Sequence, residues 1–278
     1  MTTNTNSPSE WIPVGALGDA FLPDNNCLPP VQDLAGKKLR LFFENGWVIE
    51  HEFASGERLD WRMIEGESDS RQGSELYVAT RPRENVYFVD FIKSGERATS
   101  VTLVLDFKRA SFIALIGELP TADESMTPFL SRIAQGKELT AVKLSVLRGG
   151  IDAPADDGRQ LVEPTSDLLG QRIEYTYSPH ERYEHIYLSE RFYTWRCIEG
   201  SEKGLTDTDA CHYFKIDENL YLFAWREKIV PTLGIVMVDL NALKTTGKIV
   251  GYESNDFGKL RNFTVGARAR VISVIPAE

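Results

Sequence analysis

Two phenols, one guanidinium and one carboxyl in the second half of the chain are of the types that acid–base chemistry requires. Tyr175 and Tyr177 alternate along one predicted strand and therefore share a face, and Arg196 lies in a later strand that is otherwise apolar. Glu218 begins another strand, at an expected rim of the fold. A buried phenol needs a hydrogen-bond partner or a ligand, and a carboxyl beside aromatic walls has a raised pKa suited to proton transfer. We therefore expect these four residues to be catalytic.

Four neighbouring side chains are candidates for binding the substrate. Strand parity puts Tyr183, His185 and Tyr187 on one face, which we interpret as the interior of the fold, and Tyr221 lies in the strand that Glu218 begins. The alternative is that they are ordinary core residues, because tyrosine is common in strands. The same alternative applies to the catalytic candidates, with Arg196 in a structural salt bridge and Glu218 as a solvated turn residue.

The sequence predicts neither a metal nor an organic cofactor. His180, His185 and His212 have no recognised ligand spacing, and Glu184 points to the face opposite His185. No dinucleotide fingerprint, glycine-rich phosphate loop or nucleophile elbow occurs. We expect chemistry, if any, to depend on side chains alone.

An internal duplication determines how these residues are positioned. Residues 61–66, Trp-Arg-Met-Ile-Glu-Gly, recur as residues 195–200, Trp-Arg-Cys-Ile-Glu-Gly, and 195 − 61 gives an offset of 134 residues. The same offset pairs residues 84–87 with 218–221. A self-match of this period is typical of two copies of one small domain.

Each copy predicts a meander of short antiparallel strands. In the first copy, residues 39–43 and 47–53 flank Glu44-Asn45-Gly46, a tight hairpin signal. Strands of similar length follow in both copies, with turn residues between them, among which we count residues 245–247, and one short helix is expected within residues 126–136. Such meanders close into up-and-down barrels. The sequence therefore predicts an all-β protein of two tandem up-and-down barrels.

The repeat also predicts the domain boundaries. Residues 1–32 are rich in proline and predict an irregular tail that packs on the first barrel through Trp11 and Phe21. The first barrel is expected over residues 33–150, a linker without periodicity over 151–166, and the second barrel, with the site, over 167–278.

Composition limits the partners. The chain of 278 residues has a formal net charge of −10, which disfavours nucleic acid and anionic membrane surfaces. Its 3 cysteines are widely spaced, which fits a reducing compartment, and neither a leader nor an apolar run of membrane-spanning length occurs. We expect a cytoplasmic protein whose partner is a small aromatic or conjugated molecule, with a homodimer as an open alternative.

The second copy resembles the phenolic acid decarboxylases, which are small calycin-type barrels. The matching motifs are Tyr175-Thr176-Tyr177, Trp195-Arg196-Cys197-Ile198 and Glu218-Asn219-Leu220-Tyr221, and the first copy supplies Glu44-Asn45-Gly46-Trp47. The resemblance implies that Tyr175, Tyr177 and Arg196 hold an anionic or phenolic oxygen deep in the cavity, while Glu218 donates or accepts a proton.

The whole chain, as two such halves in tandem, is similar to the MoaF family, labelled molybdenum cofactor biosynthesis protein F. The similarity covers about residues 33–278. No phosphate cradle or cysteine cluster in the sequence supports a link to molybdenum cofactor, so we do not adopt one.

Two functions fit these observations. The first is a cofactor-independent lyase or isomerase acting on a small conjugated, phenolic or carboxylate substrate in the second barrel; the alternative is a lipocalin-like carrier of a small aromatic ligand. An interaction module, with the first barrel as a docking surface, is a third reading. Arg62 and Glu84 recur in the first barrel without the phenols, which leaves a second site there open. A Glu218 that points into the cavity would favour the enzyme, and a Glu218 turned to solvent the carrier.

Overall fold

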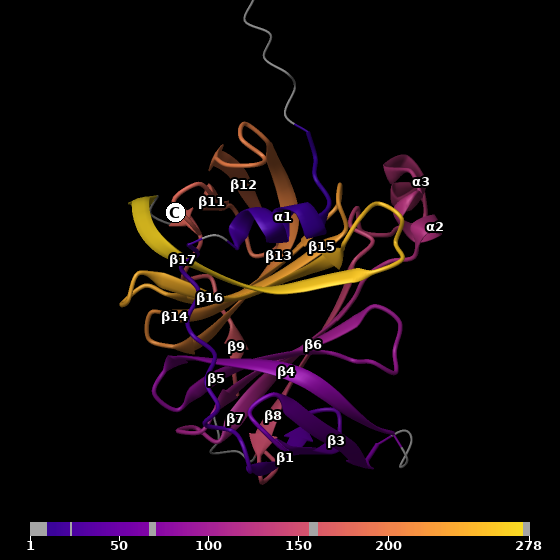
Figure 1. The fold of residues 1–278 in the computed structure, drawn as a ribbon, viewed down its shortest axis with the longest axis vertical. Helices are drawn as coiled ribbons and strands as arrows, with labels where there is room; N and C mark the ends of the chain where they lie inside the picture. Colours follow the sequence, from indigo (N-terminus) through magenta and orange to yellow (C-terminus); the bar gives the residue numbers. More distant parts are fainter. Residues whose placement is uncertain (1–9, 23, 67–70, 156–160, 275–278) are drawn as a thin grey trace, which may run out of the picture.

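The computed structural model describes residues 10–22, 24–66, 71–155 and 161–274. Two antiparallel barrels lie one above the other (Figure 1). Strands and turns make up nearly all of the described chain. The structure confirms the predicted all-β class and the two barrels in tandem.

The first barrel closes in simple sequence order. Each strand pairs with the next, and the last strand pairs with the first through Leu41 and Ile151. Its strands are β1 (Lys38–Phe43), β2 (Val48–Glu52), β3 (Arg58–Glu65), β4 (Gln72–Arg83), β5 (Val86–Ile92), β6 (Thr99–Asp106), β7 (Ser111–Glu118) and β8 (Lys143–Ile151).

The second barrel repeats this order and is closed where its last strand pairs with its first, through Tyr175 and Ala269. A two-residue strand in the expected linker, β9 (Glu163–Pro164), pairs with β13 outside the ring. The strands of the ring are β10 (Gln171–Thr176), β11 (Arg182–Tyr187), β12 (Phe192–Glu199), β13 (Thr206–Asp217), β14 (Leu220–Glu227), β15 (Thr232–Asp239), β16 (Lys244–Tyr252) and β17 (Leu260–Val274). The expected turn at residues 245–247 is wrong, because β16 runs through it.

In the described part of the chain, three short helices accompany the barrels. α2 (Ala122–Ser125) and α3 (Phe129–Ala134) form the excursion between β7 and β8, where one helix was expected. α1 (Val14–Phe21) lies across the second barrel (Figure 1). Within the described residues, no helix is both long and apolar enough to cross a bilayer.

Of the expected tail over residues 1–32, residues 1–9 and 23 lie outside the described residues, and for the others the expectation is wrong in two respects. Residues 14–21 are helical, and they pack on the second barrel rather than the first, with Val14, Leu17 and Phe21 joining its core. Gly15 and Gly18 allow the close approach, since a Cβ on Gly15 would lie 2.3 Å from the carbonyl oxygen of Glu253. An isolated helix of this length is not stable in water, so docking on the barrel must stabilise it.

The two barrels pack sheet against sheet through an apolar interface. Every residue of β6 and of β15 is buried, because one face of each strand lines its own barrel and the other contacts the neighbouring barrel. Residues that meet there include Val104 and Ile113 from the first barrel and Leu222 and Ile235 from the second. Continuous burial on both faces accounts for the nearly unbroken hydrophobic runs in these strands.

A buried ion pair lies within this interface. The Lys248 ammonium is 2.9 Å from the Asp90 carboxylate, and both residues are almost fully buried. Asp90 also accepts hydrogen bonds from Thr102 at 3.0 Å and from Asn262 at 2.6 Å. The carboxylate therefore connects strands of both barrels.

Asp90→Asn should lower the free energy of unfolding by about 3 kcal/mol, because it leaves a buried ammonium without its counter-ion. Urea denaturation of the full chain measures this value. The matched control is Glu118→Gln, which breaks the exposed Lys143 pair at 3.5 Å and should cost less than about 1 kcal/mol. Equal losses in the two variants would contradict a structural role for the buried pair.

Candidate functional site

The structure places the predicted phenols inside the second barrel. Tyr175 and Tyr187 are fully buried, and their hydroxyl oxygens are 2.6 Å apart. Tyr177 lies nearer one end, where the Phe21 ring of α1 stacks on it at 4.7 Å between centroids. Burial raises the pKa of Tyr175 and Tyr177, so both phenols are neutral at physiological pH. The interior is thus aromatic and uncharged at these positions.

Tyr183 and His185 also face the interior, as strand parity predicts. His185 is 5% exposed and lies among aromatic rings, with its centroid 5.1 Å from that of Tyr193 and 5.9 Å from that of Trp225. Burial lowers its pKa to about 3, so the imidazole is neutral. Its Nδ1 has no hydrogen-bond partner among the described residues. The aromatic interior therefore contains an unsatisfied polar atom, the His185 Nδ1, that a ligand could engage.

The structure does not bring Arg196 to these phenols. Its side chain is 52% exposed on the outer face of the barrel, where Nε is 2.7 Å from the buried Glu184 carboxylate. Arg62 pairs with Glu50 at the same distance in the first barrel. Trp195 takes the inward position instead, so the expected anion-holding role is corrected to an outer ion pair that both copies retain.

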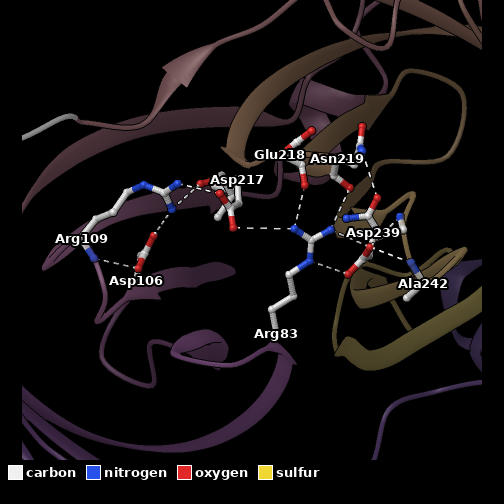
Figure 2. Close-up of polar contacts among 10 residues, drawn as sticks. Arg83, Asp106, Arg109, Asp217, Glu218, Asn219, Asp239 and Ala242 are labelled. Atoms are coloured by element: carbon white, nitrogen blue, oxygen red, sulfur yellow. Dashed lines mark hydrogen bonds and ion pairs between the residues drawn. The ribbon is translucent and has the colours of Figure 1, made fainter.

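Glu218 and Tyr221 lie at the end of the barrel away from Tyr177 and Tyr183. The Glu218 side chain is exposed, and its backbone carbonyl, not its carboxylate, accepts a hydrogen bond from Arg83 of the first barrel at 2.7 Å (Figure 2). The Tyr221 hydroxyl donates to Asp167 at 3.3 Å. Glu218 thus borders the junction of the barrels, and it is not in the cavity.

Arg83 explains why this turn is fixed. Its guanidinium makes a bidentate contact with Asp239, with both distances 2.8 Å, and a further bond to the carbonyl of Asn219 (Figure 2). Arg109 bridges Asp106 and Asp217 nearby. The turn that contains Glu218 is therefore an anchor between barrels.

Four carboxyl groups that the sequence reasoning missed gather at the other end of the second barrel. This end is formed by the turns at residues 177–181, 200–205, 228–231 and 253–259, and α1 covers it; we call it the covered mouth. The carboxyl groups belong to Glu181, Glu202, Asp209 and Glu227, of which the first three are buried.

Each carboxyl has a defined partner. The Tyr183 hydroxyl donates to Glu202 Oε2 at 3.0 Å. The Trp195 indole N–H donates to Asp209 at 3.0 Å, and that of Trp225 donates to Glu227 at 2.9 Å. These bonds hold the carboxyl groups beside the aromatic walls of the barrel.

Glycine and tryptophan complete the covered mouth. Gly200 has φ +134°, and a Cβ there would lie 2.0 Å from Glu181, whose carboxylate accepts a bond from the Ser201 N–H at 2.9 Å. The Trp11 ring meets the Trp195 ring edge-on at 5.8 Å. The N-terminal segment therefore closes over the carboxyl groups.

The electrostatics of this cluster favour proton transfer near neutral pH. Burial raises the pKa of Glu202 to about 7, with a further increase from the nearby charge of Glu181. Burial, together with Asp209 and Glu202, raises the pKa of Glu227 well above its usual value. One carboxyl that titrates near pH 7 beside a second whose pKa is also raised is an arrangement suited to acid–base chemistry.

The duplication contains a signal for part of this cluster. Trp61 and Glu75 of the first copy recur as Trp195 and Asp209 at the 134-residue offset, and Trp61 donates to Glu75 at 3.4 Å. A repeated tryptophan–carboxylate pair 14 residues apart could have been selected from the sequence alone. Among the described residues, no three histidine, cysteine or acidic side chains are arranged to hold a metal ion.

Comparison with known proteins gives a consistent result for both halves. The model of the MoaF N-terminal domain matches residues 9–121, and that of the MoaF C-terminal domain matches residues 162–275. "Protein MoaF" of Klebsiella aerogenes is 39% identical over an alignment 278 positions long, which covers 96% of this chain and 97% of the relative. A crystal structure named "putative beta-lactamase from Burkholderia vietnamiensis" matches 45% of this chain and 97% of its own, with 12% identity and a TM-score of 0.32.

Glu202→Gln should change how stability depends on pH. Because the folded-state pKa of Glu202 is about 7 against an ordinary 4.5, its protonated form contributes stability that is complete below pH 4.5 and is lost as the pH rises through 7. The unfolding free energy of the variant, relative to wild type, should rise across this window by up to about 3 kcal/mol. Urea denaturation at several pH values measures it; two parallel profiles would contradict the raised pKa.

Gly15→Ala should release α1 from the covered mouth. Alanine favours an isolated helix by about 1 kcal/mol over glycine, so a loss of docking can only come from the clash with Glu253. Limited proteolysis should cut the N-terminal segment of the variant faster than that of wild type. Ala16→Leu adds bulk on the exposed face of the helix and should leave the cleavage rate unchanged. Slower cleavage in Gly15→Ala would show that the fit at Glu253 is not tight.

Proposed function

The chain belongs to the MoaF family, and we propose that its second barrel is a cofactor-independent lyase or isomerase that acts by acid–base chemistry on a small conjugated phenol. The observation that carries this proposal is Glu202, a buried carboxyl with a pKa of about 7 that is held by the Tyr183 hydroxyl within an aromatic wall. A group of this kind can accept or donate a proton at physiological pH.

The carboxyl groups of the covered mouth limit the substrate. Glu181, Glu202, Asp209 and Glu227 lie together at this end of the barrel, so a second carboxylate bound there would meet like charge in a poorly solvated environment. A neutral phenol avoids this cost and can still donate its proton to an ionised carboxylate. Of the two substrate classes that the sequence suggests, the geometry therefore favours the phenolic one.

The proposed reaction divides proton transfer between two carboxyl groups. Ionised Glu202 takes the phenolic proton, and the electron pair on oxygen moves through the ring into the conjugated side chain. Protonated Glu227 supplies a proton to the side-chain carbon, which gives a quinone methide. An isomerase completes the reaction by losing a proton from a different carbon. A lyase loses a group whose bonding pair returns to the ring, and in both cases solvent restores the protonation of the carboxyl groups.

The carrier function is a second candidate, and two observations favour it. The Glu218 side chain is turned to solvent, which is the outcome expected for a carrier. The interior below the covered mouth is filled with aromatic rings in contact, with Phe223 5.3 Å from Trp225 and 4.9 Å from Tyr193 between centroids. A ligand held between α1 and this layer could be sequestered without reaction, because the unsatisfied Nδ1 of His185 offers a hydrogen bond but not an acid.

Glu202→Gln should lower kcat by about 100-fold or more and leave ligand affinity within about tenfold, because glutamine keeps the shape of the side chain and cannot exchange a proton. A panel of para-hydroxyphenyl compounds with conjugated side chains, followed by ultraviolet absorbance, supplies the assay, and calorimetry gives the affinity.

The matched control is Glu218→Gln at the opposite end of the barrel, which should keep the kcat of wild type. Loss of turnover in this control with full turnover in Glu202→Gln would reverse the assignment. Tight binding by wild type with no turnover of any compound would support the carrier.

A further inference from the structure

The corresponding end of the first barrel contains a cavity of about 60 Å³. Its walls are apolar and aromatic, and two cationic side chains line it as well. The residues that define its character are Trp47, His51, Trp61, Met63, Arg71 and Lys93. A concave apolar site with a few polar groups is the usual form of a small-molecule site.

The duplication shows how this end differs from the covered mouth. At the 134-residue offset, Lys93 occupies the position of Glu227, and Trp47 occupies that of Glu181. Two acids in the second barrel are thus replaced by an ammonium and an indole in the first. The two barrel ends have the same backbone arrangement, but at these positions the second barrel carries acidic side chains and the first barrel a basic and an aromatic one.

The Lys93 ammonium and the Arg71 guanidinium are held in place by neighbouring groups, and both have N–H donors that Glu96 does not occupy. The Lys93 ammonium lies 4.6 Å from the centroid of the Trp61 ring and 2.5 Å from Glu96, and Arg71 pairs with the same Glu96 oxygen. Arginine has five N–H donors and lysine three, so one shared carboxylate oxygen does not saturate them. A second carboxylate can join without displacing Glu96.

The remaining polar groups do not compete for an anion. Glu75 is engaged by the Trp61 indole N–H at 3.4 Å and by the Ser94 backbone N–H at 3.0 Å. His51 is buried, and its Nδ1 lies 3.3 Å from the carbonyl of Ile49. Burial lowers the pKa of His51 to about 4, so the imidazole adds no charge at neutral pH.

We infer that the first barrel binds a single-ring aryl carboxylate, with the ring edge in the cavity beside Trp47 and Trp61 and the carboxylate at Arg71 and Lys93. The cavity of about 60 Å³ exceeds the about 10–15 Å³ that one water needs on the same measure, so it admits the edge of a ring while the rest of the ligand lies outside. Ring stacking against indole and charge-assisted hydrogen bonds would supply the affinity. This site is separate from the one proposed in the second barrel.

The test compares phenylacetate with its neutral analogue phenylacetamide on the full chain, by calorimetry and by tryptophan fluorescence. Phenylacetate should bind at least about tenfold more tightly, and its affinity should fall with added salt as the ion pair is screened. No heat and no fluorescence change at millimolar phenylacetate, or equal affinity for the amide, would overturn the inference.

Two variants locate the site. Lys93→Gln should weaken phenylacetate binding about tenfold and leave phenylacetamide unaffected, whereas Lys108→Gln, an exposed lysine in the turn after β6, should change neither. Ile116→Trp fills the cavity from a partly exposed position and should abolish binding of both compounds. If Ile116→Trp does not fold, Met63→Phe is the alternative cavity-filling variant. Wild-type affinity in both Lys93→Gln and the cavity-filling variant would place binding elsewhere and exclude this site.

Discussion

The structure depends on the apolar contact between the outer faces of the two barrels. Strands β5 to β7 and β14 to β16 are buried on both sides. Each barrel would therefore expose an apolar outer surface to water if the other barrel were absent. The buried pair of Lys248 and Asp90 gives this contact a defined register, because a misaligned sheet would leave both charges unpaired in an apolar interior. Large flat surfaces are thereby used for assembly, and the barrel ends remain for ligands.

The duplication and the strand parity could be read from the sequence for a physical reason. The offset of 134 residues survives without a gap, and side chains in a strand alternate with period 2, so the inward positions of Tyr183, His185 and Tyr187 follow directly. The class of fold and the aromatic character of the second interior were therefore predictable.

What could not be predicted depends on contacts between distant segments. Arg196 follows Trp195 in an apolar strand, and its outward direction is shown by the core position of Trp195 and by the ion pair with Glu184 on the neighbouring strand. By contrast, the opposite ends of Tyr177 and Glu218 could have been counted, because successive turns of an up-and-down meander alternate between the two ends of the barrel. The acidic residues of the covered mouth come from turns and strand termini, where carboxylates are common on any surface.

Helix α1 could not be predicted from its own residues, because docking on the second barrel stabilises it. Its segment contains two glycines, which disfavour an isolated helix, and its N-cap residue, Pro13, makes no side-chain capping bond. The same glycines permit the approach of the backbone to β16 and β17. Likewise, Gly247, which the sequence predicts in a turn, lies within strand β16. Glycine is required there by close packing, since a Cβ would lie 2.1 Å from the carbonyl oxygen of Ile235.

The path of the N-terminal segment has a consequence for synthesis on the ribosome. The Asn26 N–H donates to Tyr177, and the Val31 N–H donates to Ala79, so the segment spans both barrels before the first strand begins. The first barrel can close as soon as β8 has emerged, whereas α1 must wait for β17, the last strand to be translated. During that interval the nascent chain exposes the apolar outer side of β5 to β7, which makes the half-translated protein a natural client for chaperones.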